Sequence, residues 1–100
     1  MKIIFKRKRI LAKEGAIGYT KAKVIECCLE YPNAYDSKEE EMETFIHEIL
    51  EAINMNLTIQ IDHEKQLAPI AEKLSEIILR LGWKIPNLEK EFEIEIEDKL

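Results

Sequence analysis

The pattern of apolar and polar positions changes its period along the chain and divides it into predicted elements. Residues 2–11 combine Ile and Phe with basic side chains, and residues 19–29 are rich in apolar and β-branched positions, so each segment predicts a strand. Gly15 and Gly18 favour a turn between them. Residues 91–97 (EFEIEIE) alternate strictly, which predicts a third strand with one acidic face. Opposite charges favour pairing of this acidic strand with the basic first strand.

Two segments between these strands carry apolar residues at helical spacing. The first runs from about Ser37 to Asn54 and opens with a capping box, in which Glu40 follows Ser37 by three residues. The second runs from about Asp62 to Leu81 and stops before Gly82; Pro69 predicts a kink or a restart in its first turns. The residues in the middle of the two apolar stripes predict the central core: Phe45, Ile49, Ile53, Leu74 and Ile78.

These elements predict a single α+β domain over residues 1–100, with a small antiparallel sheet of about three strands and two packed helices. A chain of 100 residues has room for one modest core. No apolar run approaches the roughly 18 residues needed to span a bilayer, so no membrane association is expected. The start, MKIIFKRKRI, places its charges after its apolar residues, opposite to a secretory signal. Cys27 and Cys28 are adjacent, which suits two reduced thiols in a cytoplasmic protein.

The charge balance bears on the class of partner. A net charge of -5 and a pI near 5.1 argue against a nucleic-acid-binding protein, which usually has a basic face. The one basic cluster, residues 6–9 (KRKR), is interpreted as the solvated edge of a strand in preference to a phosphate-binding patch.

The segment FIHEILEAIN, residues 45–54, carries candidate metal chemistry. His47, Glu51 and Asn54 stand at positions i, i+4 and i+7, which share one face of a helix. An imidazole and a carboxylate on that face can chelate one zinc ion. Glu48 lies about 100° further round the helix, from where its carboxylate can act as general base on a metal-bound water.

A third ligand is needed, because a catalytic zinc site has three protein ligands and an open position. The only other histidine, His63, stands four residues before Leu67 and continues the apolar stripe of the second helix, so we expect it to turn toward the first helix. Two histidines and a glutamate form the ligand set of thermolysin-type sites. The same residues also fit a simpler interpretation: the face of His47 and Glu51 lies almost opposite the apolar stripe, where a solvated face belongs, and His63 is then a partly buried histidine.

The run SKEEEMETFIHEILEAIN, preceded by a predicted strand and followed by Asp62-His63 and an amphipathic helix, resembles a group of small phage- and prophage-type proteins. These are similar to minimal zincin-like metallopeptidases of the ImmA/IrrE and SprT kind. The resemblance covers about positions 18 to 82, and its specific part is FIHEILEAIN together with His63. It implies a zincin-like minimal domain in a bacterial or archaeal host cell, acting on a protein or peptide substrate.

By this resemblance, His47, Glu51 and His63 are zinc ligands and Glu48 is the catalytic base. Glu51 stands where the family has a second histidine, which favours a harder ion such as Mn²⁺. The short chain also leaves little protein from which to build a substrate cleft. The alternative function is a non-catalytic accessory protein that keeps the fold and binds a protein partner.

Overall fold

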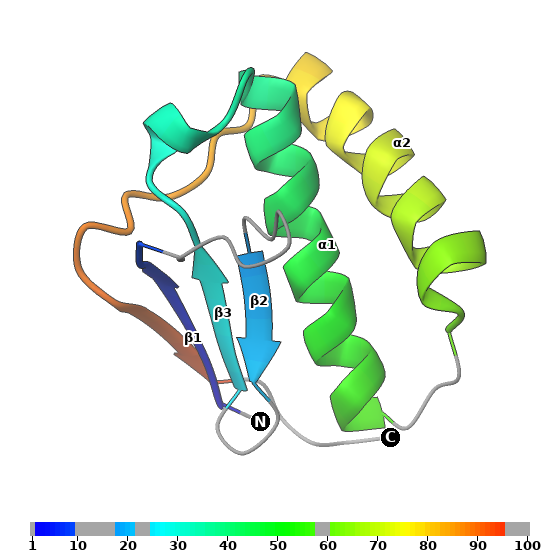
Figure 1. Ribbon diagram of the computed structural model, residues 1–100, viewed down its shortest axis with the longest axis horizontal. Helices are drawn as coiled ribbons and strands as arrows, with labels where there is room; N and C mark the ends of the chain where they lie inside the picture. Colours follow the sequence, from blue (N-terminus) through cyan, green and yellow to red (C-terminus); the bar gives the residue numbers. More distant parts are fainter. Residues whose placement is uncertain (1, 10–17, 22–24, 58–60, 96–100) are drawn as a thin grey trace.

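The computed structural model describes residues 2–9, 18–21, 25–57 and 61–95, and it shows a sheet with two helices on one side (Figure 1). The strands are β1 (Lys2–Arg7), β2 (Gly18–Lys21), β3 (Ile25–Leu29) and β4 (Phe92–Glu95). The helices are α1 (Lys38–Leu57) and α2 (Ala68–Arg80). A 3₁₀ turn, η1 (Pro32–Ala34), precedes α1, and a π-helical turn, η2 (His63–Leu67), directly precedes α2. The predicted α+β class is confirmed.

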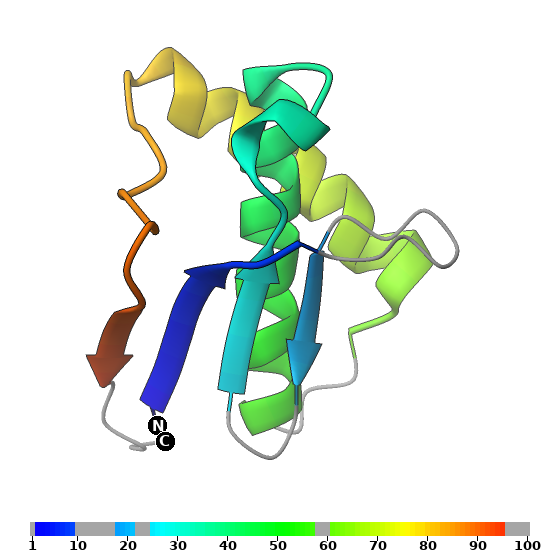
Figure 2. The ribbon, with the colours of Figure 1, turned by 60° about the vertical axis from the view of Figure 1, so that its left-hand side comes forward.

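The sheet is mixed, whereas the sequence predicted an antiparallel one. Its strand order is β2-β3-β1-β4, with β1 parallel to β3 and the two outer pairs antiparallel. β2 and β3 are neighbours in sequence and pair antiparallel along one edge of β3. β1 pairs with the other edge of β3 and runs parallel to it. Figure 2 shows this arrangement with β4 at the edge beside β1.

The second predicted strand, residues 19–29, is in fact two strands. Its first part belongs to β2 and its second part is β3, and the two pair with each other. The sequence offers no Gly or Pro between them to mark the reversal. The bulge expected near Val24 and the turn at residues 15–17 lie outside the described residues. The first strand ends at Arg7, earlier than predicted, and β4 lies within the predicted residues 91–97.

The predicted pairing of the basic and acidic strands is confirmed. Lys2 Nζ lies 2.9 Å from Glu93 Oε1, and Lys6 Nζ lies 3.9 Å from Glu91 Oε1 across β1 and β4. The hydrogen bond to Glu93 is the main reason why the pKa of Lys2 is raised above its ordinary value. Exposed ion pairs of this kind add little net stability, so their main effect is to favour β4 as the neighbour of β1.

Arg7 corrects the interpretation of residues 6–9 as a solvated edge. Its side chain is only 10% exposed, and Nη2 lies 2.9 Å from Glu41 Oε2 on α1. Its Nη1 also donates to the backbone carbonyl of Glu30 at 2.7 Å. Lys8 and Arg9 are exposed as predicted. Arg7 therefore ties the end of β1 to the start of α1.

The helix ends follow the predicted signals closely. The Ser37 hydroxyl accepts a hydrogen bond from the Glu40 N–H at 3.1 Å, and the Glu40 carboxylate accepts one from the Asp36 N–H at 2.8 Å. Helix α1 runs to Leu57, so residues 55–57, expected to be extended, are helical. Gly82 follows α2 with a φ of 80°, the left-handed conformation that ends a helix.

The core has two parts, one on each side of α1. Between the sheet and α1 lie Ile3, Phe5, Cys27, Leu29, Ala52 and Leu88, and between the two helices lie Met42, Ile46 and Ala71. Phe45 and Ile49 are partly buried and contact both parts, and Ile53 and Ile78 are partly buried. The prediction for Leu74 is wrong, because this side chain is 36% exposed. The inward side chains of this segment are instead Leu67 at the end of η2 and Ala71 and Ser75 of α2.

Candidate metal centre

Helix α1 supplies two of the three predicted ligands. His47 and Glu51 are one turn apart on the same face, and His47 Nε2 lies 3.4 Å from Glu51 Oε1. Both side chains are partly exposed. The helix is built from residues of good helical propensity between its N-terminal cap and Leu57, so this pair is fixed by local geometry alone.

The third predicted ligand, His63, is placed by a cap at the start of η2. Asp62 Oδ1 accepts hydrogen bonds from the N–H groups of Glu64 at 3.1 Å and Lys65 at 2.8 Å. In return, Gln66 Oε1 accepts a hydrogen bond from the Asp62 N–H at 2.9 Å. These reciprocal bonds satisfy the first donors of the turn and hold its first residue, His63, in one orientation.

Asn54 connects this turn to α1. Its side-chain oxygen accepts a hydrogen bond from the Ile61 N–H at 3.2 Å, two residues before His63. Asn54 stands seven residues after His47 and therefore shares its face of α1. The sequence placed Asn54 on this face but did not indicate its role, because the bond depends on the path of the chain after α1.

The three predicted ligands come together where the turn η2 meets α1. His63 Nε2 lies 2.8 Å from His47 Nε2 and 2.9 Å from Glu51 Oε1. The two imidazole rings meet edge to face, with centroids 4.6 Å apart. The predicted proximity and the predicted turn of His63 toward α1 are both confirmed. His63 is nonetheless 59% exposed, so it does not belong to a buried stripe.

The donor set fits a small divalent cation. Ligand atoms about 2.0–2.2 Å from a tetrahedral zinc ion are separated from each other by roughly 3.3–3.6 Å. The His47–Glu51 separation of 3.4 Å already matches this range, and the two separations that involve His63 are about half an ångström shorter. Binding of an ion would therefore require His63, which is 59% exposed, to move away from the other two ligands by about half an ångström. The exposed side of the group leaves room for a fourth ligand such as water.

Glu48, the predicted base, lies on a different side of α1 from His47 and Glu51. It is 4% exposed, and its backbone carbonyl accepts a hydrogen bond from the Cys27 thiol of β3 at 3.5 Å. The residue therefore sits where α1 packs against the sheet. Its role as a base stays a prediction.

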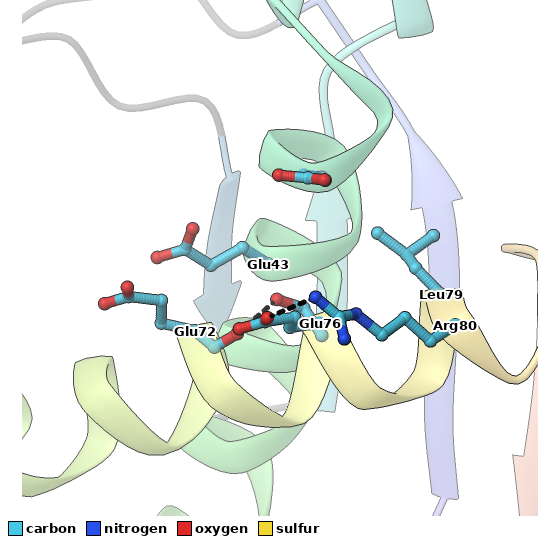
Figure 3. Close-up of a pocket in the computed structure, with 7 residues that line it drawn as sticks. Glu43, Glu72, Glu76, Leu79 and Arg80 are labelled. Atoms are coloured by element: carbon cyan, nitrogen blue, oxygen red, sulfur yellow. Dashed lines mark hydrogen bonds and ion pairs between the residues drawn. The ribbon is translucent and has the colours of Figure 1, made fainter.

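An acidic pocket that the sequence did not predict lies beside this group. Glu39 and Glu43 of α1 line a cavity of about 690 Å³ together with Glu72 and Glu76 of α2. Figure 3 shows Glu43, Glu72 and Glu76 around it, with Arg80 paired to Glu76 at 3.1 Å. On α1, Glu43 is one turn before His47. The helical spacing on each helix was visible in the sequence, but the meeting of the two acidic rows depends on how the helices pack.

Comparison with known protein families, with curated proteins and with solved structures found no match. Within the described residues, neither helix is long and apolar enough to cross a membrane.

Proposed function

We propose that this protein binds one divalent metal ion, zinc first among the candidates and Mn²⁺ as the harder alternative, through His47, Glu51 and His63. The observation that carries the proposal is the convergence of three ligand atoms from two separate elements, with separations of 2.8–3.4 Å. A shared cation would be held by the neutral form of both imidazoles, through one ring nitrogen of each. The carboxylates of the adjacent pocket add a negative potential that favours approach of a cation.

We further propose that the bound ion serves zincin-like hydrolysis of a peptide or protein substrate. Three protein ligands with one accessible position characterise catalytic zinc sites, where the ion lowers the pKa of its bound water to about 7. Glu48, next to His47 in sequence, is the candidate to accept the proton of that water. His63 is exposed enough for a substrate carbonyl to approach the same position from solvent.

A second function keeps the metal and omits catalysis: an accessory module that binds a protein partner. The burial of Glu48 against β3 favours it, since a base must reach the exposed side of the ligand group. The two functions share the metal site and differ in whether Glu48 acts as a general base.

Metal analysis and zinc titration of the full chain, purified without chelator, test the metal proposal. We expect one equivalent of zinc, and we expect His47→Ala and His63→Ala each to weaken binding at least about 100-fold. Glu89→Gln removes an exposed carboxylate from the segment that follows α2, so it is the control and should retain the affinity of the unaltered chain. Absence of zinc binding at micromolar concentrations, or equal binding by His63→Ala, would exclude the site.

The catalytic part has its own test. Hydrolysis of an unstructured protein such as casein by the zinc-loaded chain, lost in Glu48→Gln with the metal retained, would support a hydrolase. Zinc binding without cleavage would favour the accessory function, and cleavage unchanged in Glu48→Gln would show that Glu48 is not the base.

A further inference from the structure

Helix α2 and its C-terminal cap residue carry a row of four large aliphatic side chains that the described residues leave exposed. Ile70, Leu74, Ile77 and Leu81 are exposed by 47%, 36%, 56% and 65%. Their spacing of four, three and four residues places them on one narrow face of a helix, and it is the spacing of a coiled-coil seam. We call these four residues the α2 row.

The α2 row is separate from the face with which α2 packs on α1. The inward face consists of Leu67, Ala71 and Ser75, and the small side chains of the last two allow the helices to approach closely. Figures 1 and 2 show α2 as the outer layer, with α1 between it and the sheet. The acidic pocket opens beside Glu72 and Glu76, which are the polar side of α2 and not the α2 row.

The size of the α2 row can be compared with the needs of a stable interface. The exposed fractions correspond to roughly 400 Å² of apolar surface, within the range of roughly 300–600 Å² that the largest and often functional patch of a soluble monomer covers. Homodimer interfaces are about 65% apolar, so such a patch suits a footprint of roughly 600 Å² on each partner. Two copies would bury about 1,200 Å² in total, which reaches the lower end of specific interfaces.

We propose that the α2 row is the interface of a homodimer, in which α2 of one copy packs against α2 of a second copy about a two-fold axis. A two-fold axis sets the same patch against itself, so a row of Ile and Leu meets its own kind and needs no other complementary surface. Arg80 lines the acidic pocket on the polar side of α2 and is paired with Glu76 of its own helix at 3.1 Å, so it lies outside the α2 row. The inference is independent of the metal site.

Sedimentation equilibrium of the full chain tests the proposal. We expect a dimer at about 100 µM that dissociates on dilution, as the modest footprint implies. The double variant Leu74→Glu/Ile77→Glu should be monomeric at every concentration and retain its far-UV circular dichroism. Tyr31→Glu is the matched control, because Tyr31 is 47% exposed outside the α2 row, and it should still dimerise. A wild-type chain that is monomeric up to about 1 mM would overturn the proposal.

A second measurement covers the case in which the double variant does not fold. Ile77→Cys should form a disulfide-linked dimer under mild oxidation, while Tyr31→Cys should remain monomeric under the same conditions. The native thiols of Cys27 and Cys28 are buried and do not interfere. Equal cross-linking of both variants would show that the α2 row is not the interface. Because only a pair close to the two-fold axis can be bridged, absence of cross-linking excludes the row when Ile70→Cys, Leu74→Cys and Leu81→Cys also fail to form a dimer.

Discussion

At the residue scale, the three candidate ligands depend on the chain in different ways. His47 and Glu51 need only the helical repeat of α1, whereas His63 needs the cap by Asp62 and the bond between Asn54 and the Ile61 N–H. Asn54 is therefore a positioning residue: its side chain holds the segment that delivers His63. Groups of this kind commonly govern metal affinity without touching the ion.

Asn54→Ala should show this role. Loss of the hydrogen bond to Ile61 is expected to cost about 1 kcal/mol of unfolding free energy and to weaken zinc binding roughly 10- to 100-fold, because His63 is then less well placed. Urea unfolding and zinc titration measure the two effects. Asn87→Ala is the control, since Asn87 Oδ1 accepts from the Glu89 N–H at 3.0 Å in a segment away from the site. Equal affinity in both variants would contradict a positioning role.

At the element scale, the orientation of α2 separates what the sequence could predict from what it could not. The cap at Ser37 and the stop at Gly82 are local signals, and the structure confirms both, whereas the first helix runs three residues beyond its predicted end at Asn54. Apolar residues occupy a wide arc of α2, and the pattern alone does not say which half of the arc faces α1. The small side chains of Ala71 and Ser75 decide it by allowing close packing, which turns Leu74 outward.

This orientation predicts unequal costs of truncation. Ile46→Ala, at a site that is 7% exposed between the helices, should lower the free energy of unfolding by roughly 2–5 kcal/mol. Leu74→Ala should cost less than about 1 kcal/mol when unfolding is measured on dilute, monomeric protein. Similar losses at the two positions would mean that α2 packs with a different face.

The hairpin of β2 and β3 shows the same limit in the sheet. Residues 19–29 carry no turn residue of the usual kinds, so their apolar pattern predicted one strand. Pairing of β3 with both β1 and β2 decides where each strand ends, and such pairing is non-local. The proximity of His63 to His47 was predicted from an apolar stripe to which His63 does not belong, since His63 is 59% exposed. It is placed by the π-helical turn η2 and by the bond of Asn54 to the Ile61 N–H. The acidic pocket was not predicted, because it exists only between packed helices.

At the scale of the whole molecule, the candidate ligands join two elements that are otherwise held by apolar contacts. Glu51 and His47 belong to α1 and His63 to the turn that leads into α2, so a bound ion would connect the two helices. Any ligand that binds only the folded chain raises its stability by mass action. Metal binding should therefore raise the free energy of unfolding of the whole domain.

Free zinc at about 100 times its dissociation constant should add roughly 2.7 kcal/mol to the free energy of unfolding. For a domain of this size that corresponds to a rise of about 10–20 °C in Tm. Scanning calorimetry with zinc and with a chelator measures the difference. His63→Ala should show no rise; a rise of the same size in that variant would place the zinc elsewhere on the chain.

The π-helical turn η2 has a consequence for how related sequences should be compared. The Leu67 N–H donates to the Asp62 carbonyl at 2.9 Å, a bond over five residues, so this turn holds one residue more than an α-helical turn would. A relative that lacks this residue would keep the same letters, Asp-His, before its second helix. Its histidine would nevertheless point about 100° away around the helix axis. The number of residues between His63 and Ala71 is therefore a better guide to a shared site in an alignment than the presence of the histidine.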